Sequence, residues 1–374
     1  MPLVRSLYEE AFPGGNTFLF CEHPKLPLEP SPELPRTRTV PPSYFSSEEL
    51  RQEVRNYDAV VIHGMLAAFA SAIKRLPPEI LVVWCGWGFD YAHLLTGGKE
   101  GLLLPDTARI CADLRNSRRN LKDWLKALLR LAKRAAGSQA VGEPLVSVAG
   151  RINVFSVLPV EEENVRGALP AMRAIYHGLP YQTTEDVLEK GPPRMMGNDI
   201  LLGNSAAASN NHVDALKLLR ETAQDRNVIV PLSYADPGGL YTARVVEEGA
   251  RLLGDRFKPL TAWMPMERYF AHLSNCGIVI MNHRRQQALG NISAALYKGA
   301  KVFLRPENPV YRWYLEMGIK LFPVTELEQP SPAAWQGLGE GDREANRRIV
   351  GEFWKRGRAL KAIRDLESLL KTRR

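Results

Sequence analysis

Short apolar runs alternate with helical stretches along this chain, and this alternation constrains the fold more than any other feature. Strands that alternate with helices are typical of parallel α/β layers. In the first half, buried strands are expected at 16–21, 59–63 and 80–84, with helices at 47–55 and 66–75. In the second half, strands are expected at 199–203, 227–232, 257–264, 277–282 and 301–305, with helices at 213–223, 241–253, 266–274 and 292–298.

The chain has 374 residues, which is long for one domain and favours two. The region 178–198 is weakly patterned and contains Pro and Gly, so it is interpreted as a linker. We therefore expect two doubly wound domains facing a cleft, over residues 1–183 and 195–345. A C-terminal helix is expected at 346–374.

The net charge of +8 suits a nucleic acid, an anionic lipid or a phosphorylated substrate as partner. The four cysteines lie far apart without CxxC spacing, and the histidines are scattered singly, so reduced thiols in a cytoplasm are expected and a metal site is not. Apolar runs stay well below the roughly 20 residues of a membrane span, and the acidic start does not resemble a signal peptide.

Polar loops follow all five expected strands of the second half. The first is GNSAAASNNH at 203–212, longer than the roughly two to six residues of a tight connection. Because open α/β sheets bind ligands outside the carboxyl ends of their strands, these loops predict a binding site.

Individual residues suggest what this site binds. Arg284 and Arg285, together with Gly290 and Asn291 at a helix start, make a plausible diphosphate site, although a solvated turn has the same sequence. Trp263 and Met264 are candidates to sandwich a nucleobase, or else core residues. Glu307 is a candidate acceptor for sugar hydroxyls, or else a surface turn residue.

Several other nucleotide sites are disfavoured. The chain contains no GxxxxGK[ST] motif, and Gly86-Trp87-Gly88 is not continued as a dinucleotide fingerprint. There is no DxD pair, so a metal-dependent nucleotide-sugar enzyme is not expected.

Two candidate catalytic residues lie at strand ends of the first half. Asp90, in the stretch 84–91, is expected to face the cleft and to take the proton from an attacking hydroxyl, with His63 as second candidate. The alternative is that Asp90 only caps the helix that follows.

Together these motifs resemble the TDP-N-acetylfucosamine:lipid II N-acetylfucosaminyltransferase family of enterobacterial common antigen assembly. The matching elements are HG at 63–64, WxxWGxDY at 84–91, GNS at 203–205, SNxH at 209–212, VPxxY at 230–234, RQQxxG at 285–290 and RPENP at 305–309. The resemblance implies a GT-B fold, a TDP-sugar donor without a metal or other cofactor, and a polyprenyl-diphosphate-linked acceptor. In this fold the last helix crosses back to the first domain.

The resemblance extends to the sugar-donor site and to the reaction. It implies transfer of a deoxyhexose such as 4-acetamido-4,6-dideoxygalactose to a lipid-linked or other glycan acceptor. The expected donor-binding residues are Gly203, Asn204, Ser205, Ser209, Asn210, Tyr234, Trp263, Met264, Arg285, Gln286, Gln287, Gly290, Asn291, Glu307 and Asn308.

The start of the chain departs from this family. Residues 3–12 read as the first helix, so the family's first strand has no counterpart before them. Either the start is truncated or a different segment supplies that strand.

The segment 115–134 has an apolar face and a basic stripe. This pattern is typical of an interfacial helix on anionic lipid, and equally of a solvated helix packed on its own core. With a lipid-linked acceptor, docking to the inner face of the cell membrane is expected. The docking residues would be Lys122, Trp124, Lys126 and Arg130.

Two other functions remain as alternatives. One is a nucleotide-sugar 2-epimerase on the same fold, which would have no use for the basic helix. The other is a non-catalytic nucleic-acid binder, suggested by charge alone; without an RNA-binding signature, no nucleic acid is expected as partner.

Overall fold

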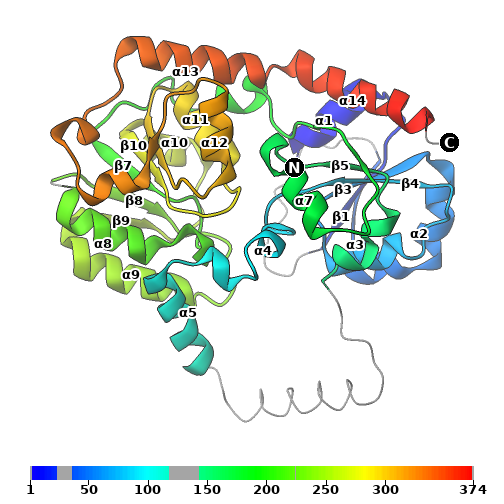
Figure 1. Cartoon of the computed structure of the whole chain (residues 1–374), viewed down its shortest axis with the longest axis horizontal. Helices are drawn as coiled ribbons and strands as arrows, with labels where there is room; N and C mark the ends of the chain where they lie inside the picture. Colours follow the sequence, from blue (N-terminus) through cyan, green and yellow to red (C-terminus); the bar gives the residue numbers. More distant parts are fainter. Residues whose placement is uncertain (1, 23–35, 118–142, 224, 373–374) are drawn as a thin grey trace. The chain divides into compact units, whose positions relative to one another are not determined.

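The structure is a computed structural model that describes residues 2–22, 36–117, 143–223 and 225–372 (Figure 1). The chain divides into two compact units. The first unit comprises Met1–Leu95, Glu143–Val187 and Gly351–Arg374, and the second comprises Thr96–Gly142 and Leu188–Val350. Each unit has its own parallel sheet and is described by itself.

The second unit is built on a six-stranded parallel sheet in the order β12-β11-β10-β7-β8-β9. The first of these strands along the chain, β7, lies in the middle beside β10, so the direction of strand succession reverses between them. Such a reversal is the switch point at which open α/β sheets bind ligands. The strands are β7 (Asp199–Leu202), β8 (Val228–Pro231), β9 (Phe257–Leu260), β10 (Cys276–Met281), β11 (Lys301–Leu304) and β12 (Phe322–Pro323).

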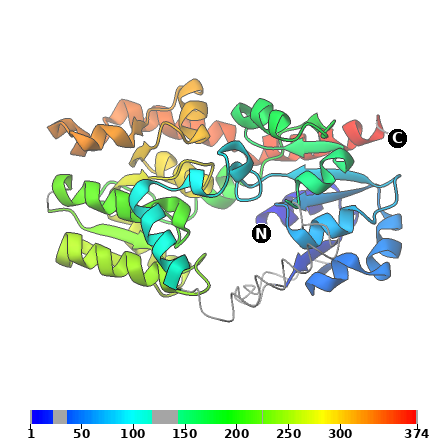
Figure 2. The same ribbon diagram turned by 60° about the horizontal axis from the view of Figure 1, so that its bottom comes forward.

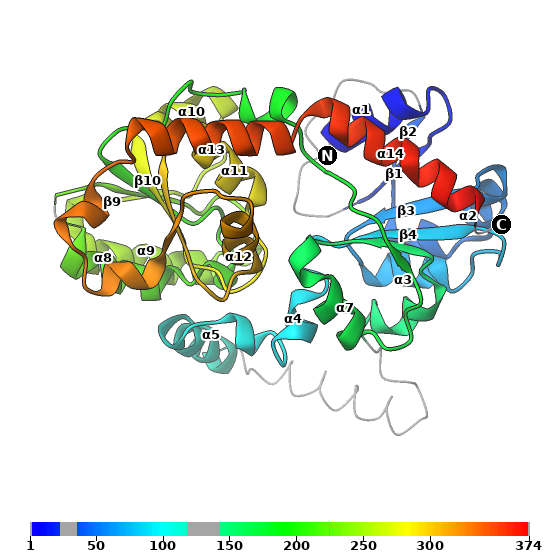
Figure 3. The ribbon, with the colours of Figure 1, turned by 45° about the horizontal axis from the view of Figure 1, so that its top comes forward.

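Helices cover both faces of this sheet. α8 (His212–Thr222) and α9 (Leu240–Leu253) lie on one face, and α10 (Met266–Ser274), α11 (Leu289–Tyr297) and α12 (Pro309–Glu316) lie on the other (Figures 1 and 3). Leu202, Leu216 and Val230 are fully buried in one core with the apolar faces of α8 and α9. Burial of side chains of this kind contributes about 1.5–3 kcal/mol each, so this core is the main source of stability.

α5 (Pro105–Ser117) belongs to the second unit, whereas the sequence placed these residues in the first domain. Ile110 and Leu114 pack into the core beneath α8 and α9 (Figure 2). Asp106 pairs with Lys217 at 2.6 Å, and its backbone N–H donates to Asp214 at 3.0 Å. The sequence missed this placement because packing between segments about 100 residues apart leaves no local signal.

The first unit has four parallel strands in the order β3-β4-β5-β6 and a separate parallel pair, β1-β2. The strands are β1 (Phe18–Cys21), β2 (Thr37–Val40), β3 (Ala59–His63), β4 (Leu81–Cys85), β5 (Val154–Ser156) and β6 (Ile175–Tyr176). The helices are α1 (Pro2–Ala11), α2 (Glu48–Glu53), α3 (Ala67–Ile73), α4 (Ala92–Leu95), α7 (Glu162–Ala168) and α14 (Arg356–Lys371).

The C-terminal segment forms two helices instead of the single predicted one. α13 (Glu340–Phe353) ends just before Trp354, and α14 then packs on α1 (Figure 3). Leu7 and Ile363 are buried in the same apolar cluster, and Arg356 pairs with Glu10 at 2.5 Å. The prediction that the last helix returns to the first domain is therefore confirmed.

Helix starts follow ordinary capping rules. The Ser47 hydroxyl accepts from the Leu50 N–H at 3.1 Å before α2, and the Asn308 side chain accepts from the Val310 N–H at 3.0 Å before α12. Pro309 occupies the first position of α12, where its missing N–H has no cost. Within the described ranges, each helix is too short or too polar to cross a membrane.

Candidate functional site

The chain leaves β7 through a residue that has to be glycine. Gly203 has a φ of 70°, and a Cβ added there would lie 2.9 Å from the Asn210 Oδ1. A residue with a Cβ would collide with the loop, and its backbone would be strained at this positive φ. The GNS sequence therefore turns the chain sharply at the carboxyl end of β7, where the switch point lies.

A chain of hydrogen bonds joins three loops at this edge of the sheet. Asn204 donates to the Tyr234 hydroxyl at 3.0 Å, and Gln287 donates to the Asn204 side-chain oxygen at 2.9 Å. The Ser209 hydroxyl donates to Gln287 at 2.7 Å and accepts from Arg285 at 3.4 Å. The sequence predicted all five of these residues as ligand-binding, and the structure brings them together.

A second layer of amides locks the loops after β7 and β10 to each other. Asn211 donates to the Asn282 carbonyl at 3.1 Å, and Asn282 donates back to the Asn211 carbonyl at 3.0 Å. Asn210 is fully buried and donates to the Ser205 carbonyl at 3.0 Å. Ser205 and Asn210, both predicted as contacts, therefore shape the loop from inside. Asn211 and Asn282 were missed, although Asn211 lies inside the polar loop that signalled the site.

A segment far away in sequence completes this edge. Arg284 donates to the Gly101 carbonyl at 2.8 Å, and the Leu104 N–H donates to Asn211 at 2.8 Å. The Asn211 side chain also donates to the Leu102 carbonyl at 3.2 Å. Residues 101–104 precede α5 and carry no recognisable motif, so sequence reasoning could not have found them.

The loop after β10 delivers the amino-terminal end of α11 to the same edge. Ala288 has a φ of 56° directly before α11, a left-handed conformation that costs about 1–2 kcal/mol for a residue with a Cβ. Gly290 and Asn291 lie in the first helical turn, where backbone N–H groups have no intrahelical acceptor. With Arg285 beside it, this turn has the chemistry to hold an anion. Gln286, also predicted, lies buried in the same loop.

Glu307 and Asn308, the two predicted contacts that follow β11, have different roles. Asn308 is fully buried, caps α12 and donates to the His283 carbonyl at 3.1 Å. Glu307 is 40% exposed and pairs with Arg305 at 3.1 Å. Burial raises the pKa of Glu307, but the Arg305 hydrogen bond, a backbone hydrogen bond and the charges of Arg305 and Arg284 together outweigh it, so the pKa lies below its usual range. Glu307 is thus an ionised acceptor at the edge, and Asn308 supports the loop.

Two buried histidines lie beneath these loops and were not predicted as site residues. The His212 imidazole contacts the Tyr241 hydroxyl at 3.1 Å, and His283 contacts the Asn308 amide at 3.2 Å. Burial lowers the pKa of each to about 3, so both are neutral at pH 7. Their second ring nitrogens, Nε2, have no hydrogen-bond partner in the described part of the chain.

Trp263 and Met264 are separate from this network. They follow β9, the edge strand, and Trp263 is 69% exposed. None of the hydrogen bonds between described residues joins them to the switch-point loops. Their role as a base-binding pair stays a prediction.

In the first unit, Asp90 accepts three hydrogen bonds and is only 6% exposed. Its Oδ2 accepts from the Met65 N–H at 2.8 Å and the Trp84 Nε1–H at 2.9 Å, and its Oδ1 accepts from the Trp87 N–H at 2.9 Å. Burial raises its pKa against the effect of these donors. Asp90 therefore ties the ends of β3 and β4 together, and its catalytic role stays a prediction.

His63 lies at the carboxyl end of β3, between the rings of Tyr8 and Trp87. Burial lowers its pKa to about 4, so its imidazole is neutral at pH 7. Its Nδ1 is buried and has no hydrogen-bond partner among the residues that the structure describes. His63 thus places a neutral imidazole at the end of β3.

The predicted membrane-docking residues lie outside the described ranges: Lys122, Trp124, Lys126 and Arg130. Across the described ranges, His, Cys, Asp and Glu form no cluster of three that could hold a metal ion.

Comparison with known families identifies one match. Residues 168–331 match the family described as 4-alpha-L-fucosyltransferase glycosyl transferase group 56. The matched range contains the whole hydrogen-bonded network from Asn204 to Gln287. The resemblance to the N-acetylfucosaminyltransferases that the motifs predicted is confirmed over this range.

Solved structures show the same fold. Sucrose-phosphate synthase from Thermosynechococcus elongatus matches with a TM-score of 0.65 and 10% identity over 99% of this chain and 93% of its own. HepE of Anabaena, in complex with UDP and glucose, matches with a TM-score of 0.56 and 11% identity over 89% and 86%. A glycosyltransferase from Rickettsia africae matches with a TM-score of 0.51 and 11% identity over 88% and 81%. The predicted GT-B fold is confirmed.

Proposed function

Since this chain is a glycosyltransferase, we propose that it transfers a deoxyhexose from a TDP-sugar to a glycan acceptor. The observation that carries this proposal is the hydrogen-bonded network at the switch point of the second unit. Ser209, Gln287 and Arg285 join the loops after β7 and β10, and Asn204 joins Tyr234 of the loop after β8, at the edge where such sheets bind nucleotides. This network lies inside the family match.

In the proposed site, each loop binds a different part of the sugar nucleotide. Arg285 and the first turn of α11, with Gly290 and Asn291, bind the diphosphate. Trp263 and Met264 contact the base, and Glu307 accepts from sugar hydroxyls. The loop from Gly203 to Asn210, with Tyr234 and Gln286–Gln287, surrounds the transferred sugar, and Asn308 supports it through the α12 cap.

The sugar and the acceptor are inferred from the family. The match to a 4-alpha-L-fucosyltransferase group supports a 6-deoxyhexose, of which 4-acetamido-4,6-dideoxygalactose is our choice. The proposed acceptor is a glycan linked to polyprenyl diphosphate. We accordingly propose a cytoplasmic enzyme that docks on the inner face of the membrane through residues 115–134.

The reaction is proposed to proceed without a metal or other cofactor. As the glycosidic bond to the diphosphate breaks, negative charge develops on the leaving nucleotide. The Arg285 guanidinium and the N–H groups that begin α11 stabilise this charge directly. Turnover is therefore expected to survive EDTA.

His63 and Asp90 are proposed to act on the acceptor in different ways. His63 receives the hydroxyl proton, because its neutral ring has a nitrogen without a partner among the described residues. Asp90 is proposed as a positioning group, since three donors already occupy its carboxylate. Loss of the base is expected to lower kcat about 10²–10⁴-fold in His63→Ala, with nucleotide affinity unchanged.

Calorimetric titration with TDP, UDP, GDP and CMP, in EDTA, tests the donor proposal. We expect TDP to bind most tightly, and Arg285→Ala to weaken it about 10–100-fold, since a charge-assisted hydrogen bond contributes about 1.5–3 kcal/mol. Arg312→Ala is the control, because Arg312 is 75% exposed and pairs with Glu316 on α12. Preference for another nucleotide would refute the TDP assignment. Failure of all four to bind would refute the nucleotide site.

A further inference from the structure

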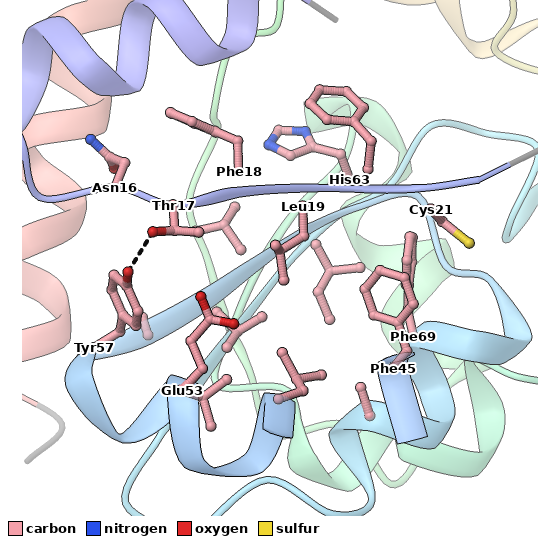
Figure 4. A pocket seen from close by; sticks show the side chains of 18 of the residues that line it. Asn16, Thr17, Phe18, Leu19, Cys21, Phe45, Glu53, Tyr57, His63 and Phe69 are labelled. Atoms are coloured by element: carbon pink, nitrogen blue, oxygen red, sulfur yellow. Dashed lines mark hydrogen bonds between the residues drawn. The ribbon is translucent and has the colours of Figure 1, made fainter. Parts of the chain in front are cut away.

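A cavity of about 400 Å³ lies inside the first unit, between β1 and β3 (Figure 4). All residues of both strands line it, and side chains such as Phe45, Leu50 and Phe69 close it from the helical side. The lining is mostly apolar. A hydrogen bond between Thr17 and Tyr57 spans one end.

The two strands that line the cavity each have one unused edge. Among the described residues, β3 pairs only with β4, and β1 pairs only with β2. Ala59, Val60 and Val61 of β3 stay half-buried, although its sequence AVVIH is a nearly continuous apolar run. Such runs are typical of parallel strands with neighbours on both sides and helices on both faces. β3 therefore has the sequence of a central strand but lies at the edge of its sheet.

The second unit shows which strand this arrangement lacks. There, β7 lies at the centre, α8 leads from it to β8, and β9 lies outside β8. On the other side of β7 lie β10, β11 and β12. In the first unit α1 leads to β1, β2 lies outside β1, and β3, β4 and β5 form the other half. Among the described residues no strand of the first unit is equivalent to β7, and the cavity lies at that place.

The position of α1 leads to the same conclusion. A helix that precedes a strand of a parallel sheet normally joins it to an earlier strand, as α8 joins β7 to β8. α1 is buried against β4, β5 and α14 through Leu7 and Tyr8, as a crossover helix would be. Yet β1 is the first strand among the described residues.

A polar atom at the cavity also lacks a partner. The Tyr8 hydroxyl belongs to a lining residue and is buried without a hydrogen bond in the described ranges. Since buried polar groups are nearly always paired, a further segment that offers a backbone carbonyl would satisfy it.

We propose that one further parallel β-strand occupies the cavity between β1 and β3. This strand belongs to a segment of the same polypeptide that runs into α1 from its amino-terminal side. Its length is set by β1 and β3, which have 4 and 5 residues, and its side chains are apolar.

Sequence excludes the undescribed internal segments as the source. Residues 23–35 contain five prolines, which a central strand does not accept because proline lacks the N–H donor. Residues 118–142 have helical periodicity over most of their length.

The proposal goes beyond the sugar-donor site, because it concerns the other unit. A parallel strand in the cavity would end at the same edge as β1 and β3. The loop that connects it to α1 would therefore lie at the ligand edge of the first unit, as 203–211 does in the second. The segment would add a ligand loop as well as a strand.

The test is to tag the carboxyl end of the protein at its own gene and to measure the intact mass of the natural product. We expect a mass above the 41.9 kDa of residues 1–374 plus the tag, by at least a strand and its following loop. A product that starts at residue 1 or 2 would overturn the proposal.

Hydrogen exchange then locates the added segment. Amides of β1 and β3 are expected to exchange at least about tenfold more slowly in the natural product than in the chain of residues 1–374. Amides of β10 serve as control, because this strand has neighbours on both sides in the second unit, and they should not change. Equal exchange of β3 in both forms would mean that the extra residues do not occupy the cavity. Neither result depends on nucleotide binding, so this test is independent of the donor proposal.

Discussion

The two units of this chain follow one plan, but only the second carries it out in full. In the second unit β7 and β10 are central, and residues of β10 are buried throughout. Among the described residues of the first unit, the sheet is split into four strands and two, and the buried apolar residues form three separate clusters. The comparison teaches that the middle strand joins the two halves of such a sheet into one core.

The largest expected effect tests how the first unit holds its strand ends together. Asp90→Ala removes the acceptor of three N–H donors, two of them on Met65 and Trp87, and leaves them buried. A buried donor left without an acceptor costs about 1–3 kcal/mol, so with three such donors we expect a loss near 4 kcal/mol in the unfolding free energy. Urea denaturation followed by tryptophan fluorescence measures it.

The control for Asp90 is Asp365→Ala on α14, where an exposed pair with Lys361 contributes less than about 1 kcal/mol. TDP affinity should be unchanged in both variants, because the contacts of Asp90 lie within the first unit. A fully stable Asp90→Ala protein with low kcat would instead restore Asp90 as catalytic base.

The next effect concerns acid stability, which should differ between the units. His212 and His283 in the second unit have pKa values of about 3, and His63 in the first has about 4. Below the unfolded pKa near 6.5, the unfolded chain takes up protons that the native state does not. The free energy of unfolding therefore decreases as the pH is lowered. Each histidine contributes about 1.4 kcal/mol per pH unit.

Between pH 6.5 and 5 the second unit should lose about 3 kcal/mol, roughly twice the loss of the first. In the first unit Asp90 acts in the opposite direction, because burial raises its pKa and the native state gains a proton first. Hydrogen exchange of β10 and β4 amides, corrected for intrinsic rates, gives the two slopes separately. Equal slopes would contradict the assignment of buried neutral histidines to the switch point.

The smallest expected effect is an increase in the free energy of unfolding. Ala288 is left-handed before α11, so Ala288→Gly should relieve backbone strain and stabilise the protein by about 1 kcal/mol. Ala294→Gly in the middle of the same helix is the matched control and should destabilise by about 1 kcal/mol. Thermal unfolding compares the two. Destabilisation by both substitutions would mean that Ala288 makes contacts worth more than its strain.

Elements with a strong local pattern were predictable from the sequence. The strands β3, β7 and β10 and the helix α10 were expected within about two residues of their observed bounds, because apolar runs and helical periodicity are local properties. The short strands β2, β5, β6 and β12 were missed. β2 reads TRTV and is largely exposed, so its sequence differs little from that of a loop.

The site was predictable where loops carry unusual composition, and only there. Ser209, Gln287 and Arg285 were predicted to lie at one edge because polar runs follow apolar strands, and the structure brings their side chains together there. The carbonyls of Gly101 and Leu102 were not, because a backbone acceptor can belong to any residue and its use depends on tertiary packing. For Asp90 the sequence predicted a catalytic base or a helix cap, and the three donors around its carboxylate depend on tertiary packing that no local pattern carries.

The packing of α14 on α1 has a consequence for the order of synthesis. The helix α1 buries Leu7 and Tyr8 against residues such as Ile363 and Leu366, which leave the ribosome only after the second unit. Until then the apolar face of α1 lacks part of its cover, while the second unit is already available to fold. The first unit is therefore completed after the second, and a nascent chain halted before α14 would expose a surface prone to aggregation.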